Sequence, residues 1–228
     1  MKILFISDIH ANLEALLSIE EEIKYADEII CVGDIVGYHC DVNEVIDFLK
    51  ANNVYCIQGN HDRYVIEGLA CQTKNINDAV RFGIEYAQKV ISKENLDWLA
   101  SLPLSIDFHF DNLHICCFHG SPWNPTEGYV YADSDLFKEM EELYANIIVL
   151  GHTHRAYKHK IAENKYVVNP GSVGQSRDIE GKACALFFDT LKFQFEDLVK
   201  DYNYNKTIQQ AISLGAKDWI YKHFQPLI

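Results

Sequence analysis

The chain has 228 residues, of which 48% are hydrophobic and 23% are charged, so it is long enough to bury the core of an ordinary globular domain. Its formal net charge of −13 argues against nonspecific binding to duplex nucleic acid or to an anionic membrane, because both need a basic face. An anionic small molecule is not excluded, since bound cations can reverse the sign of the charge locally.

The sequence offers no membrane-spanning or secretion signal. It contains no apolar run of roughly 18 residues, which is the length a transmembrane helix needs. The segment 1–6 is too short for a signal peptide and lacks a small-residue cleavage site, so we expect a cytoplasmic protein. Its seven cysteines include no C-x-x-C pair, and we expect buried thiols rather than disulfides or thiolate metal ligands.

The first part of the chain alternates short apolar runs with helical patterns. Apolar runs at 2–7, 28–32 and 54–57 predict buried strands, and periodic segments at 12–24 and 43–51 predict helices. This alternation predicts a mainly parallel sheet whose strands are joined by crossover helices.

The pattern then changes to helices and afterwards to paired strands. Segment 62–102 predicts mostly helices, with Asn77 and Ser92 as caps, and strands at 105–110 and 113–118 flank a hairpin turn at Asp111-Asn112. The remaining expected elements are a helix at 133–144, a strand at 147–150, hairpins of 156–161 with 166–168 and of 183–189 with 192–196, and a helix at 205–224. Since no repeat or linker is present, we expect one domain, 1–228, with two packed sheets and a C-terminal helical segment at about 203–228 lying on it.

Five polar motifs each follow an apolar strand. They are Ser7-Asp8-Ile9-His10, Gly33-Asp34-Ile35-Val36-Gly37, Gly59-Asn60-His61-Asp62, His119-Gly120-Ser121 and Gly151-His152-Thr153-His154. A single Asp or His after a strand is usually a cap or a turn residue. Five such motifs together are better explained by a shared site, because sheet proteins gather their loops and ligands at strand ends.

The ordered set D-x-H, G-D-x-x-G, G-N-H-D, H-G and G-H-T-H resembles the signature of the calcineurin-like metallophosphoesterases. The resemblance spans positions 8 to 154, with a further similarity at 169–174, and the short chain is similar to the compact bacterial and archaeal phosphodiesterases of that family. The fold that it implies is α/β, a four-layer α-β-β-α sandwich with two mixed sheets and a dinuclear metal site at the strand ends.

The resemblance also implies a role for each motif residue. Asp8, His10 and His154 would bind one metal ion; Asn60, His119 and His152 would bind the other; and Asp34 would bridge the two. His61 would bind no metal and would lie near the leaving group as a catalytic residue.

The chemistry of these side chains agrees with the implied roles. Two metal ions about 3.5–4 Å apart clamp the oxygens of a phosphate ester and lower the pKa of a bridging water, whose hydroxide attacks phosphorus. Imidazole and carboxylate ligands without thiolate suit Mn, Fe, Zn, Ni or Co better than Ca or Cu(I). We therefore expect two divalent transition metal ions as cofactors.

His61 is a suitable general acid for the departing alkoxide, because the ordinary pKa of histidine, about 6.5, is near neutral pH. Asp62 is a candidate second catalytic residue that orients His61, and the alternative is a cap for the following helix.

Candidate substrate contacts flank the motifs. They are Asn12, His39, Arg63, Ser172 and Arg177. The alternatives are an N-cap for Asn12, a surface loop for His39, surface ion pairs for the arginines and support of His154 for Ser172. Relatives often have Gly where this chain has Ala11, and the substitution predicts an ordinary backbone angle at that position.

The sequence supports a hydrolase of phosphodiesters or phosphomonoesters on small, nucleotide-like substrates. A non-catalytic scaffold of the same fold and a protein phosphatase are the alternatives. The presence of all seven implied ligands and of His61 favours the enzyme over the scaffold. The physiological substrate, the native metal and the oligomeric state stay open.

Overall fold

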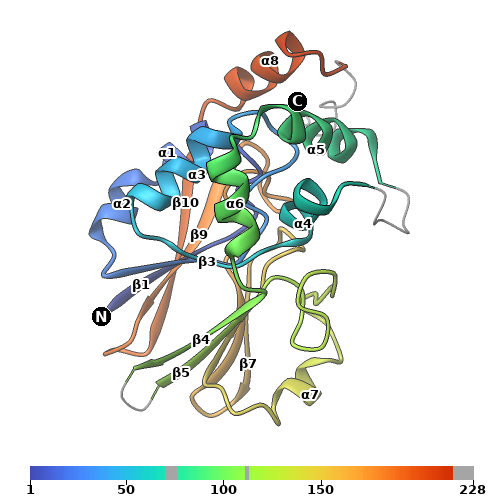
Figure 1. The fold of residues 1–228 in the computed structure, drawn as a ribbon. Coiled ribbons are helices and arrows are strands. Elements are labelled where there is room, and N and C mark those ends of the chain that lie inside the picture. Colours follow the sequence, from blue (N-terminus) through green and yellow to red (C-terminus); the bar gives the residue numbers. More distant parts are fainter. Residues whose placement is uncertain (70–75, 111–112, 218–228) are drawn as a thin grey trace.

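Two five-stranded sheets form the centre of the computed structural model, which describes residues 1–69, 76–110 and 113–217 (Figure 1). The first sheet has the order β10-β9-β1-β2-β3. Its strands are β1 (Lys2–Ile6), β2 (Glu28–Cys31), β3 (Tyr55–Cys56), β9 (Lys182–Asp189) and β10 (Gln194–Asp201). The pairs β1-β2 and β2-β3 are parallel, as the alternation predicted, whereas β9 pairs antiparallel with β1 and β10, so the sheet is mixed.

The second sheet has the order β4-β5-β6-β8-β7. Its strands are β4 (Ser105–Phe110), β5 (Leu113–Phe118), β6 (Ile147–Val149), β7 (Tyr157–Ala162) and β8 (Lys165–Asn169). Strand β6 lies parallel to both β5 and β8, and the hairpins β4-β5 and β7-β8 are antiparallel. All three predicted hairpins are therefore present as strand pairs, while the turn Asp111-Asn112 lies outside the described residues.

The two sheets face each other across an apolar layer. Phe5 and Phe188 from the first sheet are fully buried in the same cluster as Ile115, Ile147 and Val168 from the second. Strands β1, β2 and β6 have near-continuous apolar runs because both of their faces are covered, whereas the edge strand β4 alternates apolar and polar residues.

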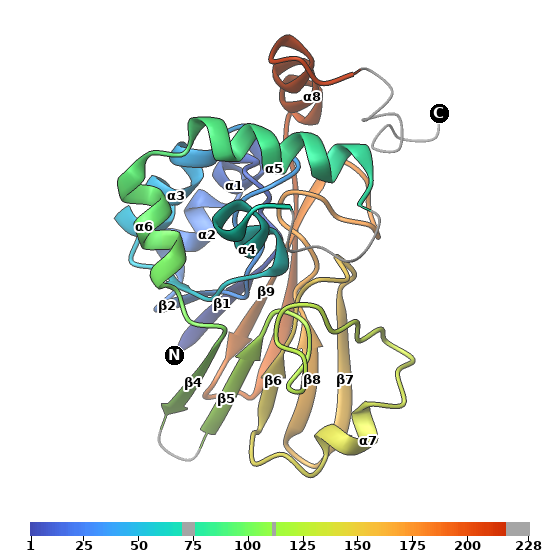
Figure 2. The ribbon, with the colours of Figure 1, turned by 45° about the vertical axis from the view of Figure 1, so that its right-hand side comes forward.

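Helices cover the outer face of the first sheet (Figure 2). They are α1 (Leu13–Leu17), α2 (Glu20–Tyr25), α3 (Val42–Ala51), α4 (Asn60–Glu67), α5 (Asp78–Val90) and α6 (Lys93–Ser101). The predicted caps Asn77 and Ser92 are confirmed, since their side chains accept hydrogen bonds from Val80 N and Asn95 N. The single helix predicted at 12–24 is wrong: fully buried Ile19 leaves the helical conformation at φ −111° and ψ 14°, which divides the segment into α1 and α2.

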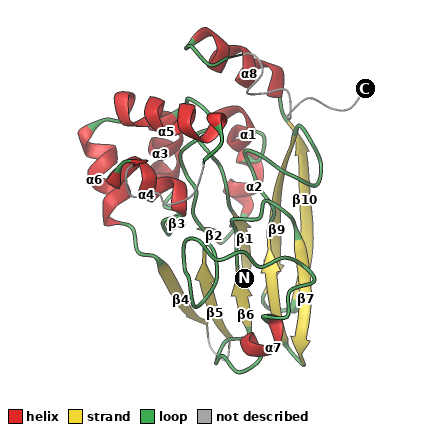
Figure 3. Ribbon diagram, turned by 90° about the vertical axis from the view of Figure 1, so that its right-hand side faces the viewer, coloured by secondary structure: helices red, strands yellow, loops and turns green. Residues whose placement is uncertain are grey.

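Among the described residues, the outer face of the second sheet carries one short helix, α7 (Phe137–Met140), which stands apart from the other helices in Figure 3. Phe137 and Met140 pack against Ile148 and Val167 of the sheet, so the expected four-layer α-β-β-α sandwich is confirmed. The longer helix predicted at 133–144 is wrong. Its first residues form a turn in which the Ser134 hydroxyl accepts from Leu136 N, a local bond that competes with a helix start.

The chain's last described element is α8 (Tyr204–Ser213), which is shorter than the predicted helix at 205–224. Ile208 and Ala211 of α8 lie in the same apolar cluster as Leu16 of α1 and Val45 of α3. Residues 218–228 lie outside the described part, so the single domain over 1–228 stays a prediction. Within the described ranges, no helix combines the length and the apolar character needed to cross a membrane.

Candidate metal centre

The five motif loops meet at one end of the sandwich, where β1, β2, β3, β5 and β6 end. Backbone hydrogen bonds join the loops directly: Asp8 N donates to Gly33 O at 3.0 Å, His10 N to Asp34 O at 3.0 Å, and Gly151 N to His119 O at 2.8 Å. Parallel strands with their carboxyl ends at the same edge thus bring together residues that are up to 144 positions apart in the sequence.

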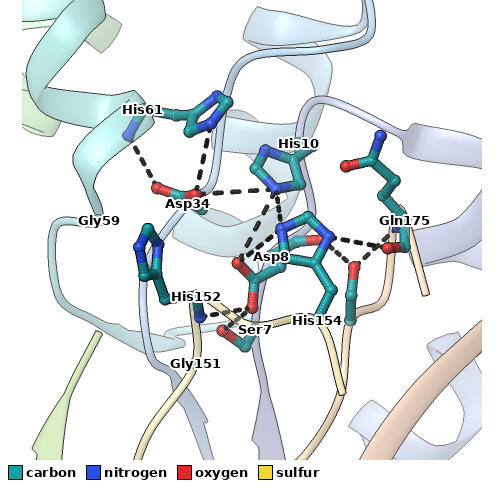
Figure 4. Close-up of polar contacts among 12 residues, drawn as sticks. Ser7, Asp8, His10, Asp34, Gly59, His61, Gly151, His152, His154 and Gln175 are labelled. Carbon is teal, nitrogen blue, oxygen red and sulfur yellow. Dashed lines mark hydrogen bonds and ion pairs between the residues drawn. The ribbon is translucent and has the colours of Figure 1, made fainter. Parts of the chain in front are cut away.

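The first group of metal-binding side chains is Asp8, His10, Asp34 and His154, whose ligand atoms all lie within 4.8 Å of one another (Figure 4). His154 Nε2 lies 3.3 Å from Asp8 Oδ1 and 3.1 Å from His10 Nε2. His10 Nε2 lies 3.7 Å from Asp34 Oδ2. Two imidazoles and two carboxylates therefore face one point.

The second group is Asp34, His119 and His152, with the same 4.8 Å limit. His119 Nε2 lies 3.4 Å from Asp34 Oδ2 and 3.1 Å from Asn60 Oδ1, so the amide of Asn60 belongs to this group as well. All seven ligands implied by the sequence are therefore brought together. Asp34 is common to both groups, which is the position that a bridging carboxylate would occupy.

The unpaired atoms of the centre fit metal ions. Among the described residues, Asp8 Oδ1, Asp34 Oδ2 and His152 Nε2 are buried and have no hydrogen-bond partner. Burying such atoms without a partner is costly, whereas metal coordination would satisfy them. The other carboxylate oxygens are occupied, because Asp8 Oδ2 accepts from the Ser7 hydroxyl at 2.6 Å and Asp34 Oδ1 accepts from His61 N at 2.8 Å.

Carbonyl groups of the surrounding loops orient the imidazoles. The Nδ1 atoms of His10, His119 and His154 lie 3.2, 2.8 and 2.8 Å from the carbonyl oxygens of Val36, Val32 and Gln175. A carbonyl can only accept, so each Nδ1 carries a proton, and Nε2 is the ring nitrogen that faces the centre and would bind a metal ion.

The backbone of the centre is strained in the way functional sites often are. Five of the seven ligands lie in the left-handed region, with φ of 53° at Asp8, 54° at His10, 53° at Asp34, 65° at His152 and 58° at His154. Ala11 also has φ 54°, so the ordinary backbone angle predicted for it is wrong. Its N–H donates to Ile35 O at 2.8 Å and its carbonyl accepts from Asp41 N at 3.0 Å, and these bonds hold the loop in a conformation that glycine adopts more easily.

Burial and mutual charge determine the protonation of the ligands. Burial lowers the pKa of His10 and His154 well below their ordinary value, and that of His152 to about 3, so these rings are neutral and ready to coordinate. Burial alone would raise the pKa of Asp34, but the histidines around it, His119 and His61 above all, hold it well below its usual range.

His61 lies over Asp34, with its Nε2 at 3.9 Å from Asp34 Oδ2, and does not belong to either metal-binding group (Figure 4). Its ring stacks on Tyr38 with the centroids 4.9 Å apart and an interplanar angle of 21°. His61 is buried, and its Nδ1 has no hydrogen-bond partner among the described residues. A buried imidazole beside the centre, with one nitrogen not hydrogen-bonded to any described residue, suits the role expected for His61.

Asp62 matches the capping alternative. Its carboxylate accepts from the N–H groups of Gly59 at 2.8 Å, Ile35 at 2.9 Å and Val36 at 3.0 Å. The Asp62 carboxylate therefore caps the start of α4 and holds the Asp34 loop against this helix. No described hydrogen bond joins the side chain of Asp62 to the ring of His61, so orientation of His61 by Asp62 is indirect, through the backbone.

Three expected substrate contacts have structural partners. Asn12 caps α1 through Ala15 N and donates to Gly174 O at 2.9 Å. The Ser172 hydroxyl donates to Asp8 O at 2.7 Å, and Arg63 pairs with Glu67 at 2.9 Å. These contacts match the structural alternatives, with one difference at Ser172. Its hydroxyl supports Asp8 directly and reaches His154 only through Gln175, whose N–H it accepts at 2.7 Å.

The two remaining candidates, His39 and Arg177, line a cavity of about 600 Å³ beside the centre. Its wall also includes Tyr38, Arg155, Tyr202 and Tyr204. The sequence did not single out Tyr38, although an aromatic residue after the Gly37 turn was a visible signal. The ring centroid of Tyr129 lies 4.0 Å from that of His152 in the second group.

The fold of the chain is similar to that of known structures. The solved structure of a metallophosphoesterase from Sphaerobacter thermophilus is 26% identical, with a TM-score of 0.79 and coverage of 96% of each chain. A hypothetical protein from Pyrococcus horikoshii OT3 shares the fold, at 18% identity, a TM-score of 0.84 and coverage of 98% of this chain and 97% of that one.

Sequence similarity identifies the family. An uncharacterized protein of Methanocaldococcus jannaschii is 32% identical over 231 residues, which covers 94% of this chain and 93% of that protein. Residues 1–191 match the calcineurin-like phosphoesterase superfamily domain, and this range contains every loop of the centre built around Asp34. Divalent metal ions are the cofactors of that family, and the two groups described above could hold them. With its motifs, fold and matched domain in agreement, the chain belongs to the calcineurin-like phosphoesterase superfamily.

Proposed function

We propose that this protein is a dinuclear metal-dependent phosphoesterase that hydrolyses phosphodiester bonds, with phosphomonoesters as the second possibility, in small nucleotide-like substrates. The observation that carries the proposal is the sharing of Asp34 Oδ2 between two groups of imidazoles. Two divalent transition metal ions, Mn, Fe, Zn, Ni or Co, would there polarise the phosphate oxygens and supply a nucleophile at neutral pH.

The protein's own residues hold this centre in place. Asp8, His10 and His154 would bind one ion, Asn60, His119 and His152 the other, and Asp34 both. The carbonyl groups of Val36, Val32 and Gln175 fix the rings, so little reorganisation is needed when the ions bind.

His61 would donate the proton that the leaving oxygen needs. It lies next to Asp34 without belonging to a metal group, and stacking on Tyr38 keeps its ring over the centre. Burial lowers its pKa in the metal-free chain, and an anionic substrate would favour the protonated ring.

The cavity beside the centre would take the group attached to phosphorus. Its volume of about 600 Å³ is within the usual range for small-molecule sites, and its wall combines tyrosines with Arg155 and Arg177. Aromatic faces and guanidinium groups are the side chains that bind a base and a phosphate. We therefore infer a nucleotide-sized substrate rather than a protein chain or duplex nucleic acid, and expect the protein to act in the cytoplasm.

The decisive experiment removes the metal and restores it. Chelated protein should have lost its activity, and Mn²⁺, Ni²⁺ or Mg²⁺ added in turn should restore it to different degrees on bis-p-nitrophenyl phosphate, p-nitrophenyl phosphate and a dinucleoside polyphosphate. Metal analysis should find about two ions per chain at the centre. Asp34→Ala should lose both ions and the activity, whereas Asp97→Ala, at an exposed acid on α6, should keep both.

Two results would contradict the proposal. Full activity in metal-free protein would exclude the mechanism. Two bound metals without activity on any phosphate ester would favour the non-catalytic scaffold instead.

A further inference from the structure

A second set of metal-binding side chains lies on the hairpin β4-β5, on strands of the second sheet. The strand register places Asp107 opposite Cys116 and His109 opposite His114. Because neighbouring Ile115 and Cys117 point into the layer between the sheets, His114 and Cys116 point to the outer face. Four side chains of metal-binding types thus share one face of a two-stranded ribbon.

Three of them converge on one another. Cys116 Sγ lies 2.8 Å from Asp107 Oδ1 and 3.3 Å from His114 Nε2, and His114 Nε2 lies 2.9 Å from Asp107 Oδ1. Ligand atoms around a tetrahedral zinc ion are roughly 3.3–3.8 Å apart, given bonds of about 2.0–2.3 Å. The three atoms therefore need to separate by up to about 0.7 Å to hold an ion.

The surroundings orient the ring of His114 for this purpose. Its Nδ1 contacts the carbonyl oxygen of Tyr144, which can only accept, so Nδ1 carries a proton and Nε2 is the ring nitrogen that faces Asp107 and Cys116. The ring of His109 stacks on it with the centroids 4.1 Å apart and an interplanar angle of 15°. A histidine fixed through its second nitrogen is the usual arrangement at metal sites.

The cluster is reachable from solvent. The side chain of Asp107 is 56% exposed and that of His114 is 19% exposed. An ion can therefore enter without unfolding the sheet, and the fourth position of a tetrahedron would face water or the neighbouring His109.

A reactive thiol is the alternative use of a Cys-His-Asp cluster. Burial, together with the neighbouring Asp107, raises the pKa of Cys116 to about 12, so without a metal the sulfur stays a protonated thiol. A thiolate nucleophile needs the opposite environment. A divalent ion would bind the thiolate, and the displaced proton would go to solvent.

We propose that Asp107, His114 and Cys116 form a separate binding site for Zn²⁺ or a related borderline-soft divalent ion. The donor set of one sulfur, one nitrogen and one oxygen suits zinc better than Mg²⁺ or Ca²⁺. Two ligands come from β5 and one from β4. Because β4 is the edge strand of its sheet, the ion would cross-link this edge strand to its neighbour β5.

Cobalt titration tests the site, because Co²⁺ bound to a thiolate absorbs in the near ultraviolet and Co²⁺ bound only to nitrogen and oxygen does not. The metal-free, reduced protein should develop this absorption band on addition of Co²⁺ and lose it on addition of Zn²⁺. The centre at Asp34 has no sulfur ligand, so Asp34→Ala should keep the band and lose about two of about three bound ions. Cys116→Ala should lose the band and about one ion.

Cys117→Ala is the matched control, since Cys117 is the next residue on β5 but points into the buried layer, and it should keep the band. His114→Ala and Asp107→Asn provide the test if Cys116→Ala fails to fold by circular dichroism; each should weaken Co²⁺ binding at least about tenfold. No band in the wild-type protein, a band that survives Cys116→Ala, or unchanged affinity in the His114 and Asp107 variants would overturn the proposal.

Discussion

Gly37 and His61 are in contact in a way that leaves no room for a side chain at position 37. An ideal Cβ on Gly37 would lie 2.5 Å from Nδ1 of His61 and 3.2 Å from its Cβ and Cγ. Gly37 also has φ +95°, in the left-handed region that favours glycine. With Tyr38 stacked on the same ring, the Gly37-Tyr38 turn fixes His61 over Asp34.

Gly37→Ala should therefore lower the rate of phosphate-ester hydrolysis by roughly a hundredfold, because it displaces His61 by about 1 Å. Gly215→Ala is the matched control, since Gly215 has φ +104° and nothing within 4 Å of an added Cβ. Urea unfolding should show that both variants lose about 1–2 kcal/mol of stability from the backbone alone. Equal rates for the two variants would show that the contact with His61 does not matter.

His61→Ala should keep both metal ions and lose roughly 10²–10⁴-fold in rate on substrates with a poor leaving group. The reason is that the ring is next to the centre yet outside both ligand groups. Substrates with a p-nitrophenolate leaving group, which needs no proton, should lose much less. Metal analysis is the control: a variant that loses an ion would reassign His61 as a ligand.

Arg177→Ala should raise KM about tenfold, because a hydrogen bond to a charged group contributes about 1.5–3 kcal/mol. Arg177 lines the cavity, and its charge contributes, after burial, to the lowered pKa of His154, so its electric field reaches the centre. Arg63→Ala is the control, since Arg63 is occupied by Glu67 on the exposed face of α4. A similar KM in both variants would remove Arg177 from substrate recognition.

The motif residues that the sequence singled out lie together in the structure, because each motif follows a strand. Each ligand stands directly after an apolar strand, and the topology of parallel strands brings such positions together without further information. The strands and helix caps also depend on local patterns, which explains why Asn77 and Ser92 were correctly predicted as N-caps.

The errors concern residues whose conformation depends on distant contacts. At Ile19 the backbone leaves the helical conformation while the side chain stays buried, and the helical spacing of the apolar residues does not show this break. Ala11 adopts φ 54°, and its backbone is bound by the neighbouring Asp34 and Asp41 loops. The Asp107-His114-Cys116 cluster follows the hairpin register that strands 105–110 and 113–118 predict, but the contacts among these side chains depend on their rotamers, which the sequence does not show. The sequence also does not decide the role of Asn12. Its cap bond with Ala15 N and its bond to Gly174 O can form with or without a substrate contact.

Metal uptake should release protons, and the apparent affinity for Mn²⁺ should rise with pH. Burial would lower the pKa of His119, but Asp34 and Asp8 overcome it and raise the pKa to about 10, so the ring carries a proton at neutral pH in the metal-free protein. Burial raises the pKa of Asp8 to about 7, which adds a second proton below that pH. A metal ion must displace both protons, so affinity should fall with decreasing pH and fall more steeply below about pH 7. Calorimetric titrations between about pH 6 and pH 8, in buffers with different heats of ionisation, count the protons released. Asp8→Asn should remove the steeper part below about pH 7 and keep the dependence due to His119, whereas an affinity independent of pH would show that both groups are already deprotonated.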